Sequence, residues 1–161
     1  MAPTPSPPAR SRSKTPSPPR KPSPPPARVP VFISIYNVYD ARDPCHWALF
    51  LAGGGTNDVI LQVGDDKNGK GYYVENVMHG KQPQKSSMHQ VSIQVGSVLA
   101  QNLPSVTTII NSTPVDNRSK TWNCQAWCVE ALDALEHSKV GDFRWVPTAK
   151  AEVERRRQRW Q

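Results

Sequence analysis

Apolar and polar residues alternate over several short stretches in the first two thirds of the chain, a pattern typical of β-strands. β-branched and aromatic residues are concentrated in these stretches, and turn-forming residues separate them. The strands predicted in this way cover residues 31–39, 45–51, 58–63, 71–77 and 89–95. The frequent turns indicate that each strand is short.

A helical pattern appears in the last third of the chain. From Cys124 onward, apolar residues recur at i, i+4, i+7, i+8 and i+11, which predicts a helix over residues 121–137. Gln125 and the acidic residues of this segment are expected on the opposite, solvent-facing side. Residues 97–115 fit a helix or a strand, with the helix preferred. The arginine-rich residues 149–161 are expected to form a short basic helix or tail.

Proline and charge are distributed unevenly along the 161 residues. Residues 1–28 hold 11 of the 17 prolines and six Lys or Arg without any acid, whereas residues 29–161 hold 14 basic and 13 acidic side chains. A segment of this composition cannot bury a core, so we predict a disordered Pro/Ser/Arg-rich arm over residues 1–28. Residues 29–148 have the size of one domain, which excludes a multi-domain enzyme.

The sequence of the arm is compatible with three roles. It can be a spacer. Pro5, Pro8 and Arg10 have the PxxPx(K/R) spacing that SH3-like domains bind, and Ser17 precedes a proline in the form that proline-directed kinases favour. Its positive charge would attract nucleic acid, but the arm has no aromatic residue for base stacking, which argues against that partner.

The length and distribution of apolar segments exclude some cellular locations. No apolar run approaches the roughly 20 residues that span a bilayer. The N-terminus has neither the apolar core of a secretory signal nor the amphipathic helix of a mitochondrial presequence. We therefore expect an intracellular protein, either cytoplasmic or nuclear.

Three cysteines are too few for a disulfide framework. Cys128 lies one helical turn inside the predicted helix and is expected to be a structural thiol. Cys45 is expected to face the opposite side of its strand from His46. The cysteines and histidines lack the CxxC or HxxxH spacing of zinc sites, and we expect neither a metal nor a cofactor.

Cys124 falls in the first turn of the predicted helix, with Ser119 or Thr121 available as the cap. Unpaired N–H groups and the helix dipole at such a position favour a thiolate, which is a nucleophile. An imidazole is the usual proton acceptor for it. His46 is the leading candidate because, of the four histidines, only His46 lies inside a strongly apolar strand. Each of the two alone fits an ordinary core residue, and the pair is what indicates chemistry.

The strand His46-Trp-Ala-Leu-Phe-Leu51, followed about 75 residues later by Trp122-Asn-Cys-Gln-Ala-Trp127, resembles the circularly permuted papain-like fold. That group includes lecithin:retinol acyltransferase-like enzymes and PPPDE-type isopeptidases. The pattern is also similar to a group of fungal proteins with a His-Trp strand and an Asn-Cys-Gln-x-Trp helix. Over residues 30–137, the resemblance implies an α+β fold in which an antiparallel sheet packs against the Cys-bearing helix.

The sequence departs from the acyltransferase relatives in two places. Those relatives carry a second histidine on the next strand to orient the first, whereas this chain has Gln62 there. Glutamine can hydrogen-bond an imidazole but supplies no charge. Asp65 and Asp66 are alternative orienting groups. The relatives' motif after the cysteine is also replaced, by Gln125-Ala-Trp, which argues against acyl transfer from phospholipids.

The sequence thus predicts a thiol hydrolase or acyltransferase acting on an amide, isopeptide or ester carbonyl, with a protein or peptide as the substrate. In this hypothesis Cys124 attacks the carbonyl, His46 is general base and then acid, Gln62 orients the ring, and helix-start N–H groups hold the oxyanion. Hydrolysis is favoured because no long apolar segment is present to bind lipid. The alternative is a non-catalytic interaction module whose arm binds SH3-like domains or kinases.

Overall fold

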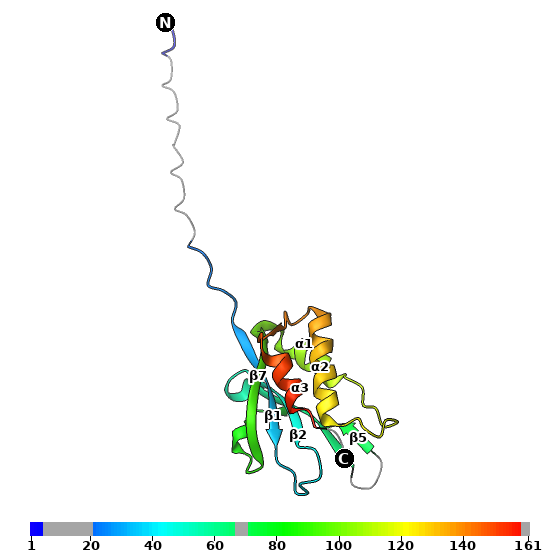
Figure 1. The fold of residues 1–161 in the computed structure, drawn as a ribbon. Helices are drawn as coiled ribbons and strands as arrows, with labels where there is room; N and C mark the ends of the chain where they lie inside the picture. The colour runs from blue at the N-terminus through cyan, green and yellow to red at the C-terminus, as the bar shows by residue number, and fades with distance from the viewer. Residues whose placement is uncertain (5–20, 67–70, 159–161) are drawn as a thin grey trace.

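The computed structural model describes residues 1–4, 21–66 and 71–158. The chain has an α+β fold (Figure 1). Its elements are β1 (Arg28–Tyr36), β2 (His46–Ala52), β3 (Asp58–Leu61), β4 (Val63–Asp66), β5 (Gly71–Val74), β6 (Met78–His79), β7 (His89–Leu99), α1 (Leu103–Asn111), α2 (Cys124–Ser138), β8 (Arg144–Trp145) and α3 (Ala149–Arg156). Most of the predicted arm, with its SH3-type motif and Ser17, lies outside the described residues.

Six strands form one antiparallel sheet in the order β6-β3-β2-β1-β7-β8, and β4 pairs with β5 in a separate two-stranded ribbon. β1 lies between β2 and β7 in the sheet. Ile35 of β1 is opposite Trp47 of β2 on one side and Val91 of β7 on the other. The antiparallel sheet packs against helix α2, which carries the buried Cys124. The predicted α+β class, with a sheet against a Cys-bearing helix, is confirmed at this level.

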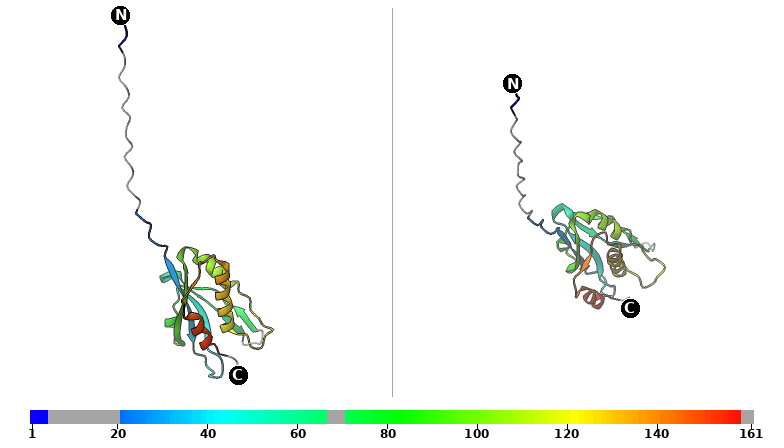
Figure 2. Two further views of the ribbon diagram at one scale, coloured as in Figure 1. Left: turned by 45° about the horizontal axis from the view of Figure 1, so that its top comes forward. Right: turned by 90° about the horizontal axis from the view of Figure 1, so that it is seen from above.

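The helices gather on one face of the sheet, where they bury the main core (Figure 2). Alternate residues of β1, such as Ile33, belong to this core together with Val106 of α1, Leu132 of α2 and Val153 of α3. The opposite face holds a smaller cluster around Phe50. Within the described part of the chain, no helix is both long and apolar enough to cross a membrane.

Several predicted boundaries change in the structure. β1 begins and ends three residues before the predicted range 31–39. The ambiguous residues 97–115 are divided, because β7 continues to Leu99 before α1 begins. Pro104 lies in the first turn of α1, where its missing N–H costs nothing. The pattern also missed β4, β6 and β8. β6 and β8 have only two residues each, too few to show a period, and β4 has no alternation of apolar and polar residues after Val63.

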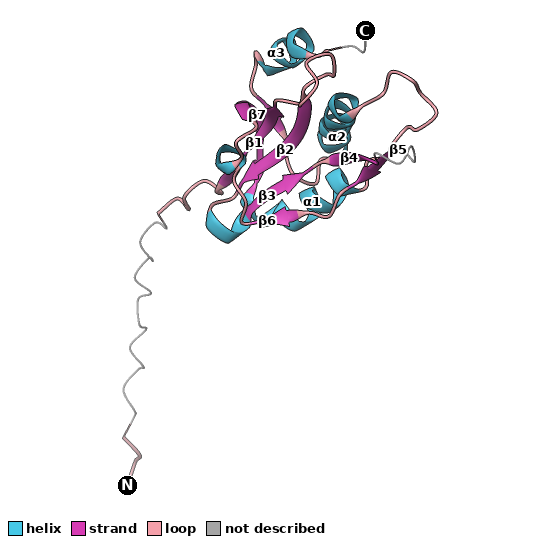
Figure 3. Ribbon diagram, turned by 90° about the horizontal axis from the view of Figure 1, so that it is seen from below, coloured by secondary structure: helices cyan, strands magenta, loops and turns pink. Residues whose placement is uncertain are grey.

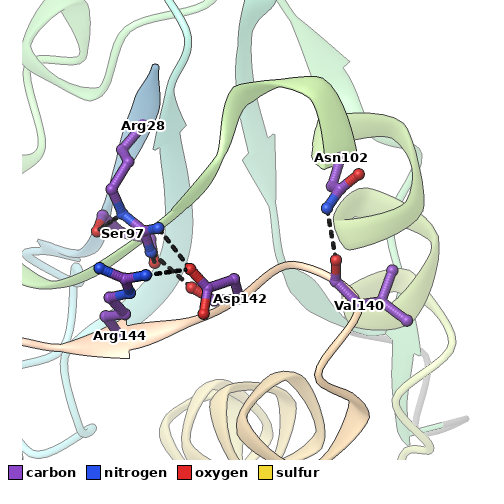
Figure 4. Close-up of polar contacts among 6 residues, drawn as sticks. All are labelled: Arg28, Ser97, Asn102, Val140, Asp142 and Arg144. Atoms are coloured by element: carbon purple, nitrogen blue, oxygen red, sulfur yellow. Dashed lines mark hydrogen bonds and ion pairs between the residues drawn. The ribbon is translucent and has the colours of Figure 1, made fainter. Parts of the chain in front are cut away.

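Arg28 ties the first residue of β1 to two distant segments (Figure 4). Its guanidinium donates to Oγ of Ser97 at 2.9 Å and to Oδ2 of Asp142 at 2.7 Å. Arg144 of β8 lies 2.7 Å from the same carboxylate oxygen. The hydrogen bond from Arg28, and then that from Arg144, hold the pKa of Asp142 below its usual value. The ordered sheet therefore begins at Arg28, after the exposed residues 21–27.

The turn between α2 and β8 leaves no room for a side chain at Gly141, because a Cβ there would lie 2.6 Å from Cγ2 of the buried Val106. We expect Gly141→Ala to lower the free energy of unfolding by about 1–3 kcal/mol, the usual cost of overpacking. Urea denaturation measures the change. Val140→Ala, a control at a neighbouring exposed side chain, should change stability by less than about 0.5 kcal/mol. Equal stability of Gly141→Ala and the natural chain would contradict this packing of α1.

Candidate active site

Cys124 is the first residue of α2 and is almost completely buried. The helix cap is Asn123, not Ser119 or Thr121 as expected from the sequence. The Asn123 side chain accepts hydrogen bonds from the two backbone amides that follow Cys124, at 3.0 and 3.3 Å. Its extended backbone and short polar side chain are those of an ordinary N-cap. The cap fixes the direction in which the first turn of α2 starts.

The sulfur of Cys124 lies against the beginning of β2. The backbone amide of Trp47 donates to Sγ at 3.4 Å, and the carbonyl oxygen of Cys45 lies 4.0 Å from it. Cys124 and His46 both line one cavity of about 540 Å³. The structure thus brings the predicted nucleophile and the predicted base to the same cavity from segments far apart in the sequence.

His46 is bound on its far side by Gln62, with Nε2 of the ring 2.9 Å from Oε1 of the amide. The Gln62 amide nitrogen in turn donates to Oε2 of Glu75 at 2.5 Å. A carboxylate only accepts, so the amide nitrogen must face Glu75 and the amide oxygen must face the ring. Nε2 of neutral His46 therefore carries the proton. Nδ1 is left as the nitrogen that can accept a proton from Cys124.

Opposing effects act on the pKa of His46. Burial lowers it, but the hydrogen bond and charge of Cys124, the hydrogen bond of Gln62 and the charge of Glu75 together raise it above 6.5. Hydrogen bonds and negative charges around a ring favour imidazolium, whereas desolvation disfavours it. Cys124 and His46 line the same cavity, and Gln62 hydrogen-bonds the ring. Cys124, His46 and Gln62, the three site residues predicted from the sequence, therefore lie in one contiguous group.

Glu75 is the site residue that the sequence analysis missed. Gln62 does not lie inside a strand as predicted, because β3 ends one residue before it and β4 begins one residue after it. The β4–β5 ribbon pairs Val63 with Val74, which brings the following Glu75 beside Gln62, and the Glu75 amide donates to the Gln62 carbonyl at 3.0 Å. Asn68-Gly69 is a hairpin signal in the sequence that could have predicted this register.

Asp65 and Asp66 were expected as alternative groups to orient His46. Asp65 lines the cavity, but Glu75 is the carboxylate that contacts Gln62. The side chain of Asp66 lies outside the described part of the chain. Gly64 of β4 makes room for this arrangement, because a Cβ at that position would lie 2.5 Å from Oε1 of Glu75. The ribbon lies beside α2 (Figure 3), so it can deliver Glu75 to the site.

Gln125 was predicted on the solvent side of the helix, and this prediction was wrong. The side chain is completely buried. It donates to the carbonyl of Cys45 at 2.9 Å and accepts from the backbone amide of Gln158 at 2.8 Å. The Gln158 side chain closes the group by accepting from the Cys45 amide at 2.7 Å. Helical periodicity could not reveal this, because the covering segment follows α3 and is distant in sequence.

The other two cysteines differ from Cys124 in their surroundings. Cys128 is completely buried, and burial, followed by the charge of Cys124, raises its pKa well above the ordinary value. A thiol of this kind is unreactive. Cys45 precedes β2 and is only partly buried. Among residues 1–4, 21–66 and 71–158, no group of three or more His, Cys, Asp or Glu side chains could hold a metal ion.

Comparison with known proteins identifies a family for most of the domain. A family of unknown function, DUF6540, matches residues 31–142. The chain belongs to this family. The DUF6540 region contains His46, Gln62, Glu75 and Cys124, so the whole group described above lies inside it, whereas α3 and the N-terminal arm lie outside. No curated protein and no solved structure matches the chain significantly.

The raised pKa of His46 can be tested by following its ring signals with pH in NMR. We expect a midpoint above 6.5 in the natural chain and a lower midpoint in Cys124→Ala, because burial then acts with less opposition. Glu75→Gln should lower the midpoint by a smaller amount. The ring binds its proton more tightly in the folded chain, so its contribution to stability is complete below pH 6.5 and is lost as the pH rises through the folded-state pKa.

The ring signals of His79 are a suitable control, because this exposed residue of β6 does not line the cavity. They should be the same in the natural chain and in Cys124→Ala. A His46 midpoint that does not respond to the loss of Cys124 would show that the thiol and the ring are not coupled.

Proposed function

We propose that this domain is a thiol-dependent hydrolase or acyltransferase in which Cys124 and His46 act on a carbonyl carbon. The observation that carries the proposal is the placement of His46, which lines the same cavity as Cys124 and is hydrogen-bonded by the Gln62 amide. A nucleophile, a base within reach of it, and a third group that orients the base are the parts that covalent thiol catalysis needs.

The proposed reaction begins when Cys124 transfers its proton to Nδ1 of His46. Sγ then forms a bond with the substrate carbonyl carbon. His46 returns the proton to the leaving nitrogen or oxygen as its bond to carbon breaks. Water or an amine then releases the acyl group from the thioester. Gln62 keeps Nε2–H directed away from the thiol throughout, and the negative charge of Glu75 stabilises the transient imidazolium.

The cavity lining mixes apolar side chains with three carboxylates, and the carboxylates disfavour a long acyl chain. Asp43, Asp65 and Glu75 line the cavity that contains Cys124. Carboxylates beside an aliphatic chain would lose their hydration without gaining partners, which is costly. An amide or isopeptide bond of a protein or peptide fits this lining better than a lipid ester does.

The chain order supports a relation to the circularly permuted papain-like fold. The strand with His46 precedes the helix with Cys124, and the helix begins at the cysteine. An antiparallel sheet packed against that helix is the arrangement that the resemblance implies. The relation is part of the proposal, and it accounts for the use of an amide side chain as the orienting group.

Alkylation of Cys124 by iodoacetamide, followed by peptide mass spectrometry, tests the thiol–imidazole pair. We expect His46→Ala to slow alkylation at pH 7 by about tenfold or more, because the base that accepts the thiol proton is removed. His79→Ala, which removes an exposed ring on β6 that does not line the cavity, should leave the rate unchanged. Peptides with amide and isopeptide bonds should be cleaved by the natural chain and not by Cys124→Ala.

A Cys124 alkylation rate that is indifferent to His46→Ala would contradict the proposal. The cysteine would then be a structural thiol, and the domain would fit the non-catalytic interaction module that the sequence also allows.

A further inference from the structure

The start of α2 offers fewer free oxyanion donors than the sequence suggested. Of the first three amides of the helix, the second and third are taken by the side chain of Asn123, at 3.0 and 3.3 Å. The amide of Cys124 itself is the one that remains for a substrate. A tetrahedral intermediate is usually held by two donors, so a second donor must come from elsewhere in the cavity.

Tyr72 of β5 has the position for this role. It lines the same cavity as His46 and Cys124, and it lies close enough to Cys124 to respond to its charge. The rings of Tyr72 and Trp122 pack edge to face, with their centroids 5.3 Å apart. Trp122 lies two residues before the start of α2, so this contact holds the phenol close to the first turn of the helix.

The backbone of Tyr72 is also fixed. Its amide donates to Oδ1 of Asn117 at 2.7 Å, and its carbonyl accepts from Nδ2 of the same side chain at 2.9 Å. Two hydrogen bonds from one amide side chain anchor this residue of β5 to the loop that leads into α2. A donor held before the reaction starts costs little reorganisation when negative charge develops, which is the condition for effective oxyanion stabilisation.

We propose that the phenolic O–H of Tyr72 is a second oxyanion donor, acting with the Cys124 amide when the thiol attacks a carbonyl. The inference rests on the proposed thiol chemistry and adds a catalytic residue to it. Tyr72 lies on the β4–β5 ribbon, the element that also delivers Glu75, so one ribbon would supply both the donor and the charge behind Gln62.

The surroundings of Tyr72 keep its phenol protonated. Burial, followed by the charges of Cys124, Asp65 and Asp43, raises the pKa of Tyr72 to about 12. The hydroxyl therefore remains a donor over the whole neutral range. The same carboxylates repel an oxyanion that forms in the cavity, which increases the need for a donor there.

Two reagents separate an oxyanion donor from a residue that only packs the site. Iodoacetamide alkylates Cys124 by direct displacement at a saturated carbon, and no oxyanion forms. p-Nitrophenyl acetate acetylates it through a tetrahedral intermediate: Sγ forms a bond with the acetyl carbon, the ester C–O bond breaks, p-nitrophenolate leaves, and the thiol proton passes to His46. Absorbance of p-nitrophenolate gives the acetylation rate, and the rate of Cys124→Ala is subtracted from each measurement.

Tyr72→Phe removes only the hydroxyl and keeps the ring against Trp122. We expect it to slow acetylation by about 100-fold, the usual effect of losing one oxyanion donor, and to change the alkylation rate by less than about twofold. Tyr73→Phe is the matched control, because it deletes the same group from the half-exposed neighbour on β5. It should change neither rate.

The other outcomes overturn the inference in distinguishable ways. An equal fall of both rates in Tyr72→Phe would show that the hydroxyl only maintains the site. Unchanged rates would show that the donor is elsewhere, while the thiol chemistry stands. Acetylation of the natural chain that is no faster than that of Cys124→Ala would overturn the proposed function and this inference together.

Discussion

The candidate site depends on the alignment of the first turn of α2 with the first residues of β2. The hydrogen bond from the Trp47 amide to the sulfur of Cys124 marks this alignment, but a bond to sulfur is too weak to enforce it. The apolar face of α2 has the larger effect, because each buried leucine, such as Leu132 and Leu135, contributes about 1.5–3 kcal/mol through burial. The core therefore sets the position of the helix, and the polar contacts of the site adjust to it.

Glutamine in the orienting position departs less from a charged triad than the sequence alone indicates. Gln62 is neutral, yet Glu75 lies directly behind it and fixes which end of the amide faces the ring. A hydrogen bond to a charged group is worth about 1.5–3 kcal/mol, enough to hold one amide orientation almost exclusively. The negative charge that an aspartate triad places next to the base is here one side chain further away.

The sequence predicted the parts of the structure that depend on local pattern. The first two long strands and α2 were found because their apolar residues recur with a clear period. His46 and Cys124 lie on β2 and α2 as predicted, whereas Gln62 lies between β3 and β4. The way the elements pack against one another could not be predicted from local pattern. Glu75 depends on the register of the β4–β5 ribbon, and the burial of Gln125 depends on a segment that returns after α3. The helix cap was missed because three polar residues precede α2 and only the backbone conformation selects Asn123.

The contacts of Gln158 make the last described residue of the chain part of the site's architecture. Gln158 follows an arginine-rich stretch in the sequence. Its hydrogen bonds connect the segment before β2 to the buried Gln125 of α2. Detachment of the segment after α3 would leave the amide oxygen of the buried Gln125 without its partner, a cost of about 1–3 kcal/mol. Detachment of this segment and loosening of the loop that carries Cys45 are therefore coupled, and the free energy of this opening sets how long the segments around the thiol stay assembled.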